Sequence, residues 1–194
     1  MNKKVQKINF DEHFSREEQL PRKFSVLFKE VGSPTRPAVK VSYNDEPLGD
    51  VINDNAYGND FYRYHDIFHY TFATLLGWSP CARAMLRKKR KSDAIIDTIE
   101  DGARAAITEE AISLIIFNEA KRKAFFEHHR KVSKTTLRII KEMTENFEVK
   151  YRSGADWEFA ILRSYDIFRK LITHQGGKVD FDMVMKEIEF STIN

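Results

Sequence analysis

Two histidines four residues apart give the clearest chemical signal in the sequence. His65 and His69 lie in the segment Tyr62-Arg63-Tyr64-His65-Asp66-Ile67-Phe68-His69, where the apolar spacing predicts a helix at about 60–76. Residues four apart share a helix face, and Asp66 lies on a face that is partly shared. Paired imidazoles prefer zinc or a later transition metal, whereas magnesium needs carboxylates. We therefore expect His65, Asp66 and His69 to bind a divalent metal, which is Mg, Mn or Zn.

The carboxylates that phosphate chemistry would need lie on a long helix predicted at about 94–129. Glu109 and Glu110 are flanked by Ala105-Ala106-Ile107 and by Ala111-Ile112, so at least one of the two acids is expected to face a crowded interior. Such an acid should be paired, metal-bound or protonated. A catalytic role for Glu109 or Glu110 and a purely structural pair with Arg104, Arg63 or a histidine are equally compatible with the sequence.

One basic run could collect phosphate groups. It extends from Arg87 to Lys91, with Arg83 one turn earlier. Charge alone could attract a nucleotide or a nucleic acid to this run, but no aromatic residue interleaves it to stack bases, so a solvated helix end is the favoured interpretation. If the chain is an enzyme, we expect substrate contacts from Tyr62, Arg63, Arg87 and Lys88, and a phosphate-steadying role for Arg104.

Two further features have a structural interpretation that we favour. The polar stretch at 53–60 could complete a site at the start of the histidine helix, but such residues more often cap helices or form turns. Cys81 is the single cysteine, and a nucleophilic role would require a positioned base, so we expect a small core residue. Glycine-rich phosphate loops and the HExxH and GxSxG motifs do not occur in the sequence.

The elements that must position these residues are expected to be mainly helical. Residues 1–22 are expected to form a loosely structured arm, and 23–194 a single helical domain. Alternating apolar residues predict an N-terminal hairpin at 23–43 and a closing hairpin at 178–190. Helices are predicted at about 60–76, 80–91, 94–129, 134–148 and 155–174. The expected fold class is a bundle of four to five helices with small β-hairpins near both termini.

Composition limits the class of protein. The chain has 194 residues, 42% hydrophobic and 31% charged, and a formal net charge of +3, which fits a globular domain and excludes disorder. The sequence shows neither a signal-peptide pattern nor an apolar stretch long enough to cross a membrane. A cytoplasmic location is the default expectation. Fifteen Phe and seven Tyr are an unusual aromatic content, and many of them crowd the histidine helix.

The residues also resemble a known family. The motifs are Asp54-Asn55-Ala56-Tyr57, the 62–69 segment, Leu76-Gly77-Trp78-Ser79-Pro80, Arg87-Lys88-Lys89-Arg90-Lys91-Ser92-Asp93 and Glu100 to Glu110. Together they resemble the helical domain found C-terminal to MazG-type nucleotide pyrophosphohydrolase domains, over nearly the whole chain. The resemblance implies a setting in nucleotide metabolism or phage defence.

The catalytic residues of MazG enzymes are not carried over by this resemblance. MazG catalytic cores hold magnesium with ExxE followed by ExxD, and this chain has an ExxE at 142–145 but no ExxD. The pair His65-Asp66 is similar to the dyad of HD phosphohydrolases, although the earlier histidine of that family is poorly matched by His13. Arg122 to His128 fits the spacing of HEPN ribonucleases, but so do two other Arg–His pairs.

The sequence therefore supports two hypotheses of different classes. The first is a metal-dependent nucleotide phosphohydrolase or pyrophosphohydrolase related to MazG-associated proteins. The second is a noncatalytic module that senses a nucleotide or scaffolds a MazG-like partner chain, with a HEPN-like ribonuclease as a more remote alternative. A nucleotide is the expected ligand and a nucleic acid is less favoured. The sequence does not decide whether the chain forms a homo-oligomer.

Overall fold

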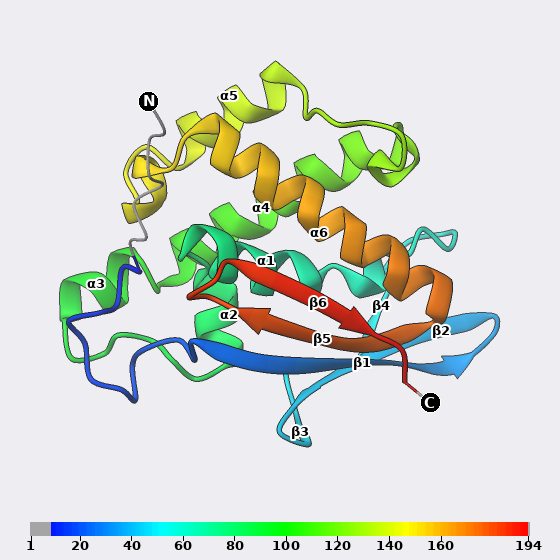
Figure 1. The fold of residues 1–194 in the computed structure, drawn as a ribbon, viewed down its shortest axis with the longest axis horizontal. Coiled ribbons are helices and arrows are strands. Elements are labelled where there is room, and N and C mark those ends of the chain that lie inside the picture. The colour runs from blue at the N-terminus through cyan, green and yellow to red at the C-terminus, as the bar shows by residue number, and fades with distance from the viewer. Residues whose placement is uncertain (1–8, 194) are drawn as a thin grey trace.

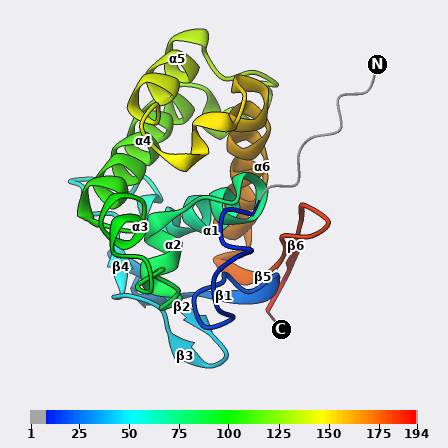
Figure 2. The same ribbon diagram turned by 90° about the vertical axis from the view of Figure 1, so that its left-hand side faces the viewer.

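A six-stranded antiparallel sheet carries the helices on one of its faces in the computed structural model, which describes residues 9–193 (Figure 1). The strand order is β3-β2-β1-β5-β6, and β4 also pairs with β2. The strands are β1 (Lys23–Ser33), β2 (Arg36–Tyr43), β3 (Glu46–Pro47), β4 (Ile52–Asn53), β5 (Gly176–Asp182) and β6 (Glu187–Ser191). The sheet and the helices form two layers, which are visible in the turned view (Figure 2).

The expected mainly helical bundle of four to five helices is wrong. The described residues contain six α-helices, and 45% of the structure is helical while 19% is strand. The two hairpins lie near their predicted ranges, but they are parts of one sheet because residues 23–29 of β1 pair with β5. Each hairpin alone would expose an unpaired strand edge, and joining the two edges satisfies those backbone groups.

Gly176 shows why this pairing was missed. Gly176 and Gly177 come just after the helix predicted at 155–174, where glycine is typical of a helix end, yet both residues belong to β5. Gly176 has a φ of +125°, and a Cβ there would lie 2.4 Å from the carbonyl oxygen of Phe28 on β1. Only glycine permits this close approach of the two strands.

Most helices are shorter than predicted, while the helix predicted at 155–174 keeps its range to within one residue. The helices are α1 (Asp66–Leu76), α2 (Pro80–Met85), α3 (Ala94–Ile99), α4 (Ala103–Lys121), α5 (Lys134–Met143) and α6 (Gly154–His174), with single 3-10 turns at Tyr62–Tyr64, Ala124–Phe126 and Glu148–Tyr151. The long helix predicted at 94–129 is divided into α3 and α4, because Gly102 adopts an extended backbone and caps α4. No helix among the described residues is long and apolar enough to cross a membrane.

Helix α1 is the centre of the fold. All eleven of its residues are buried, since it lies between the sheet strands β5 and β6 and the helices α2 and α6. On the sheet, the alternating side chains of Phe24, Val26 and Phe28 are buried against the helical layer. Gly77 ends α1 in the left-handed conformation. Any polar side chain on α1 must therefore find its partners inside the protein.

The described part of the N-terminal arm is held by buried ion pairs. Asp11 accepts hydrogen bonds from the Leu20 amide and from Arg83 of α2, at 2.8 and 2.9 Å. Arg90, which is 1% exposed, forms ion pairs with Asp101 at 2.7 Å and Glu148 at 2.8 Å. Two cations of the basic region that the sequence suggested for phosphate binding are thus engaged in the interior.

Candidate metal centre

The two histidines of the central helix each have one ring nitrogen fixed by a hydrogen bond. His65 Nδ1 lies 3.0 Å from the carbonyl oxygen of Tyr62, and because a carbonyl only accepts, Nδ1 carries the proton. His69 Nδ1 lies 2.8 Å from Oε1 of Glu109 on α4. In both rings the remaining nitrogen, Nε2, is therefore the one that can bind a ligand.

The two Nε2 atoms converge with one carboxylate. His69 Nε2 lies 3.3 Å from Oε1 of Glu110, and His65 Nε2 lies 4.0 Å from Oε2 of the same side chain. Ligand atoms of His65, His69 and Glu110 all lie within 4.8 Å of one another. Two ligands of a tetrahedral ion at zinc–nitrogen distances stand about 3.3 Å apart, so the separations suit a shared cation after small side-chain movements.

His69 Nε2 is also a buried polar atom with no hydrogen-bond partner. The side chain of His69 is 1% exposed, whereas that of Glu110 is 45% exposed. An unsatisfied buried nitrogen is costly, and it requires an explanation. A cation held between the two rings and Glu110 would supply the missing partner of His69 Nε2. Because Glu110 is partly exposed, solvent can reach this cation position.

Glu109 supports His69 from the other side. It is fully buried, and Oε1 accepts hydrogen bonds from His69 Nδ1 and from Ser79 Oγ at 2.6 Å. Its Oε2 accepts from the backbone amide of Cys81 at 2.9 Å. A carboxylate that orients a histidine through Nδ1 is the usual outer partner of a metal-binding imidazole.

The electrostatics of the cluster depend on burial and on these contacts. Burial lowers the pKa of His65 and raises that of Asp66. Burial also opposes protonation of His69, but the charge of Glu109 and the contacts of the ring with Glu109 and Cys81 together outweigh burial and raise the pKa of His69 well above its ordinary value. Burial alone would raise the pKa of Glu110. The contact with His69 and the charges of both rings outweigh burial, and they lower this pKa to about 2. A metal ion would thus replace a proton on His69.

Asp66 lies beside the three converging ligands. Its Oδ1 is 3.5 Å from His65 Nε2, and it is not part of the group of His65, His69 and Glu110. The ring of Tyr62 stacks on His65 with centroids 4.2 Å apart and planes nearly parallel. Burial, followed by the charge of Glu110, raises the pKa of Tyr62 to about 12. Tyr62 therefore forms an aromatic wall of the cluster.

A second set of donors, formed by His69, Cys81 and Glu109, fits a metal less well. His69 Nδ1 and Glu109 Oε1 already share a hydrogen bond. The Cys81 thiol lies 3.7 Å from the carbonyl oxygen of Ala106. Burial, and then the Glu109 charge, raises the pKa of Cys81 to about 12. A thiol that stays protonated is neither a good ligand nor a good nucleophile.

The structure does not bring the remaining predicted residues to this cluster. Arg104 is exposed on α4, and Arg87 is exposed beyond α2. Lys88 Nζ donates to the carbonyl oxygen of Arg16 at 3.3 Å. Arg63 is buried and forms ion pairs with Asp54 at 2.9 Å and Glu30 at 3.3 Å, so it is not free to bind a substrate.

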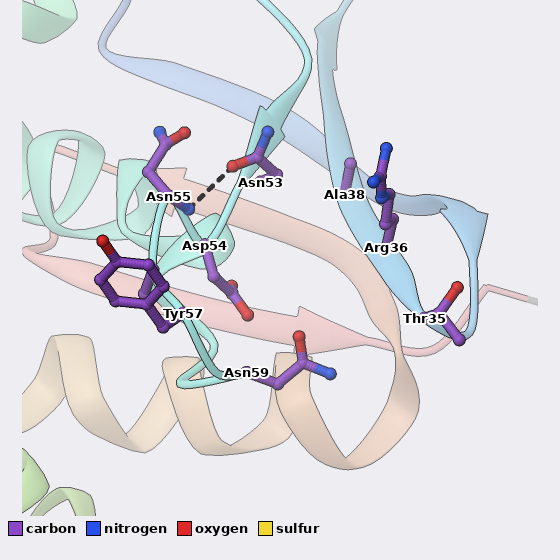
Figure 3. Close-up of a pocket in the computed structure, with 9 residues that line it drawn as sticks. Thr35, Arg36, Ala38, Asn53, Asp54, Asn55, Tyr57 and Asn59 are labelled. Carbon is purple, nitrogen blue, oxygen red and sulfur yellow. Dashed lines mark hydrogen bonds between the residues drawn. The ribbon is translucent and has the colours of Figure 1, made fainter.

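The polar stretch at 53–60 lines a separate cavity of about 730 Å³ between the start of β2 and the loop after β4 (Figure 3). Its lining residues are Thr35, Arg36, Ala38, Asn53, Asp54, Asn55, Ala56, Tyr57 and Asn59. Asn53 Oδ1 accepts from the Asn55 amide at 2.8 Å, and Asp54 accepts from the amides of Asp60 and Arg63. These contacts agree with the favoured turn and capping interpretation of this stretch.

The histidine partner that the sequence allowed for Glu109 is His69, but sequence reasoning missed the other two partners, Ser79 and the Cys81 amide. Ser79 caps α2 by accepting from the Ala82 amide, and its hydroxyl donates to Glu109. The sequence Ser79-Pro80 is a typical helix start, so it predicts the cap. The amide of Cys81 near this helix start was therefore available to an anion, but nothing in the sequence indicated that the anion would be Glu109.

The fold is that of an α+β domain, and its helical layer holds a cluster of two histidines and one partly exposed carboxylate. The family model of the MazG C-terminal domain matches residues 5–194, and the chain therefore belongs to that family. No curated protein and no solved structure gives a significant match.

Proposed function

We propose that this chain is a divalent-metal-dependent phosphohydrolase or pyrophosphohydrolase that acts on a nucleotide. The observation that carries the proposal is the buried Nε2 of His69, which has no hydrogen-bond partner and lies close to Glu110 and to Nε2 of His65. The nucleotide is suggested by membership of the MazG C-terminal domain family and by the resemblance of this chain to domains adjoining nucleotide pyrophosphohydrolases.

The donor set supports a catalytic ion more than a structural one. Structural zinc sites take four protein ligands, whereas catalytic sites keep three and leave a position open. Two imidazoles favour zinc or a later transition metal over magnesium. An ion bound by His65, His69 and Glu110 would neutralise phosphate charge and lower the pKa of a coordinated water.

The neighbouring acids take different roles in this proposal. Asp66, whose pKa is raised by burial, lies 3.5 Å from His65 Nε2 and is suited to accept a proton from the attacking water. Glu109 is fully buried and accepts three hydrogen bonds, so we assign it a positioning role and not the role of a base.

Hydrolysis measurements test the proposal. Chelator-treated protein is resupplied with Mn²⁺ or Zn²⁺ and incubated with each common nucleoside triphosphate, and the released phosphate and pyrophosphate are quantified. Metal-dependent release is expected from the wild type and from the control Glu142→Gln, which removes a carboxylate 68% exposed on α5. His69→Ala and Glu110→Gln should fall to the rate without metal. Equal rates in all four proteins would refute the proposal.

The noncatalytic module remains the second candidate, and one observation favours it. A protonated His69 can bridge Glu109 at 2.8 Å and Glu110 at 3.3 Å as a buried ion-pair network without any metal. In that case the wild type neither retains metal nor hydrolyses nucleotides, while His69→Ala still lowers the thermal stability.

A further inference from the structure

The most basic segment of the chain is the connection between α4 and α5. Residues 121–134 contain six Lys or Arg, two His and a single acid, Glu127, whereas the whole chain has a net charge of only +3. We call residues 121–134 the basic loop. It lies at the opposite end of α4 from α3, far from the 87–91 run that the sequence first suggested for phosphate binding (Figure 1).

Most of the charge of this loop is available to a ligand. Lys121 and Lys123 form ion pairs with Asp60 and Glu119, at 2.8 and 2.5 Å. The other four cations are exposed and have no carboxylate partner among the described residues; they are Arg122, Arg130, Lys131 and Lys134. His128 and His129 between them are also exposed. Uncompensated cations at this density repel one another unless an anion binds.

The loop is held in a defined shape despite its exposed charges. Phe126 and Val132 anchor it in the core, being 3% and 4% exposed. Arg169 of α6 donates to the carbonyl oxygen of Phe125 at 2.6 Å, and the Val132 amide donates to Glu158 at 3.0 Å. The cations are therefore presented from a fixed backbone, which reduces the conformational entropy lost when a ligand binds.

We propose that the basic loop binds the phosphate backbone of a single nucleic-acid strand without base preference. Four free cations along 122–134 match a row of phosphates better than the one cluster of phosphates on a mononucleotide. The loop has no exposed aromatic ring for base recognition, because Phe126 is buried and Phe125 is only partly exposed. A membrane surface fits less well, since no apolar side chain flanks the charges to enter a bilayer.

This inference goes beyond the proposed function and does not depend on it. The metal centre is on the first half of α4, and the basic loop follows the end of that helix. Glu110 and Arg122 are twelve positions apart, which corresponds to about 18 Å along a helix. Loss of one site should leave the other intact.

Fluorescence anisotropy with labelled oligonucleotides tests the inference. Oligo(dT) and oligo(rU) of about 20 nucleotides are titrated with the full chain over a range of NaCl concentrations, so that the DNA and RNA arms identify which strand is bound. The test variant is Arg122→Gln/Arg130→Gln/Lys131→Gln/Lys134→Gln. The control removes four exposed cations elsewhere, as Arg16→Gln/Lys29→Gln/Lys40→Gln/Lys91→Gln. Circular dichroism checks that both variants fold.

Wild type should bind at least one oligonucleotide at about 0.1 M NaCl, and the test variant should bind at least about tenfold more weakly. The slope of log affinity against log salt should become less negative by about 3, or about 0.7 for each lost phosphate contact. The control and Glu110→Gln should keep most of the affinity, the latter even where hydrolysis is lost. An equal loss in the control, no binding by wild type, or binding only to vesicles of phosphatidylserine would overturn the inference.

Discussion

His69 and Glu109 form a fully buried pair in which Nδ1 and Oε1 are 2.8 Å apart, and this contact connects the central helix α1 to α4. It fixes the ring so that Nε2 points toward Glu110. The chemistry that we assign to the cluster therefore depends on a residue, Glu109, that never meets solvent.

Replacing Glu109 by Gln should weaken both folding and metal binding. The amide group of Gln brings its own N–H donors toward the Cys81 amide or Ser79, and it removes the charge opposite His69. We expect a loss of about 1–3 kcal/mol in the free energy of unfolding, measured by urea denaturation without metal. Metal affinity should fall by about 10–100-fold. Unchanged metal affinity in a folded Glu109→Gln protein would contradict the positioning role.

Cys81 should be chemically inert. Burial and the Glu109 charge raise its pKa to about 12, so the thiolate is scarce at neutral pH. Native protein should react with iodoacetamide much more slowly than urea-unfolded protein at pH 8, as followed by mass spectrometry. Cys81→Ala should retain the metal-dependent hydrolysis of the wild type. Rapid alkylation of native protein with loss of hydrolysis would show instead that the thiol takes part.

The buried ion pairs of Arg90 should matter for stability. Arg90 contacts Asp101 at 2.7 Å and Glu148 at 2.8 Å, and both Arg90 and Asp101 are almost fully buried. Asp101→Asn leaves part of the Arg90 charge uncompensated, so we expect a loss of about 3–5 kcal/mol in urea denaturation. Asp50→Asn, in the exposed connection between β3 and β4, removes a carboxylate with no ion pair among the described residues; it is the control and should change stability little. Similar free energies of unfolding for the two variants would contradict a stabilising role for the Arg90 ion pairs.

Metal binding should compete with protons. The pKa of His69 is raised above its ordinary value of 6.5 by Glu109, and a metal can bind Nε2 only after the proton leaves. While the ring is protonated, apparent affinity should therefore increase about tenfold for each unit of pH, and this dependence should continue through neutral pH. Calorimetric titrations between pH 6 and pH 8 in buffers of different ionisation enthalpy measure the proton released. Affinity independent of pH would be inconsistent with a ligand role for His69.

The sequence predicted the residues of the cluster better than their roles. Spacing placed His65 and His69 on one helix face, and apolar neighbours indicated that an acid at 109 or 110 would be buried. Consecutive helix positions point about 100° apart, so the packing of α4 against α2 decides that Glu109 faces inward and Glu110 faces the opening. That packing depends on contacts between segments that are distant in sequence. Residue spacing within one segment carries no information about such contacts.

Long-range pairing also explains the wrong fold class. Alternation in 23–43 and 178–190 predicted each hairpin, but the pairing of Phe28 with Gly177 joins residues nearly 150 positions apart. Charge runs were equally ambiguous without the fold. Arg90 forms ion pairs with acids in the interior, whereas four cations of the basic loop are exposed and unpaired among the described residues. Only the packing around each run shows which cations are available to a ligand.

Isothermal titration of chelator-treated protein with Zn²⁺ and Mn²⁺ tests the metal centre most directly. We predict one ion per wild-type chain. Binding should be lost in folded His69→Gln and Glu110→Gln proteins and retained in Glu142→Gln. A wild type that binds neither ion, or a His69→Gln protein that binds as tightly as wild type, would contradict the account.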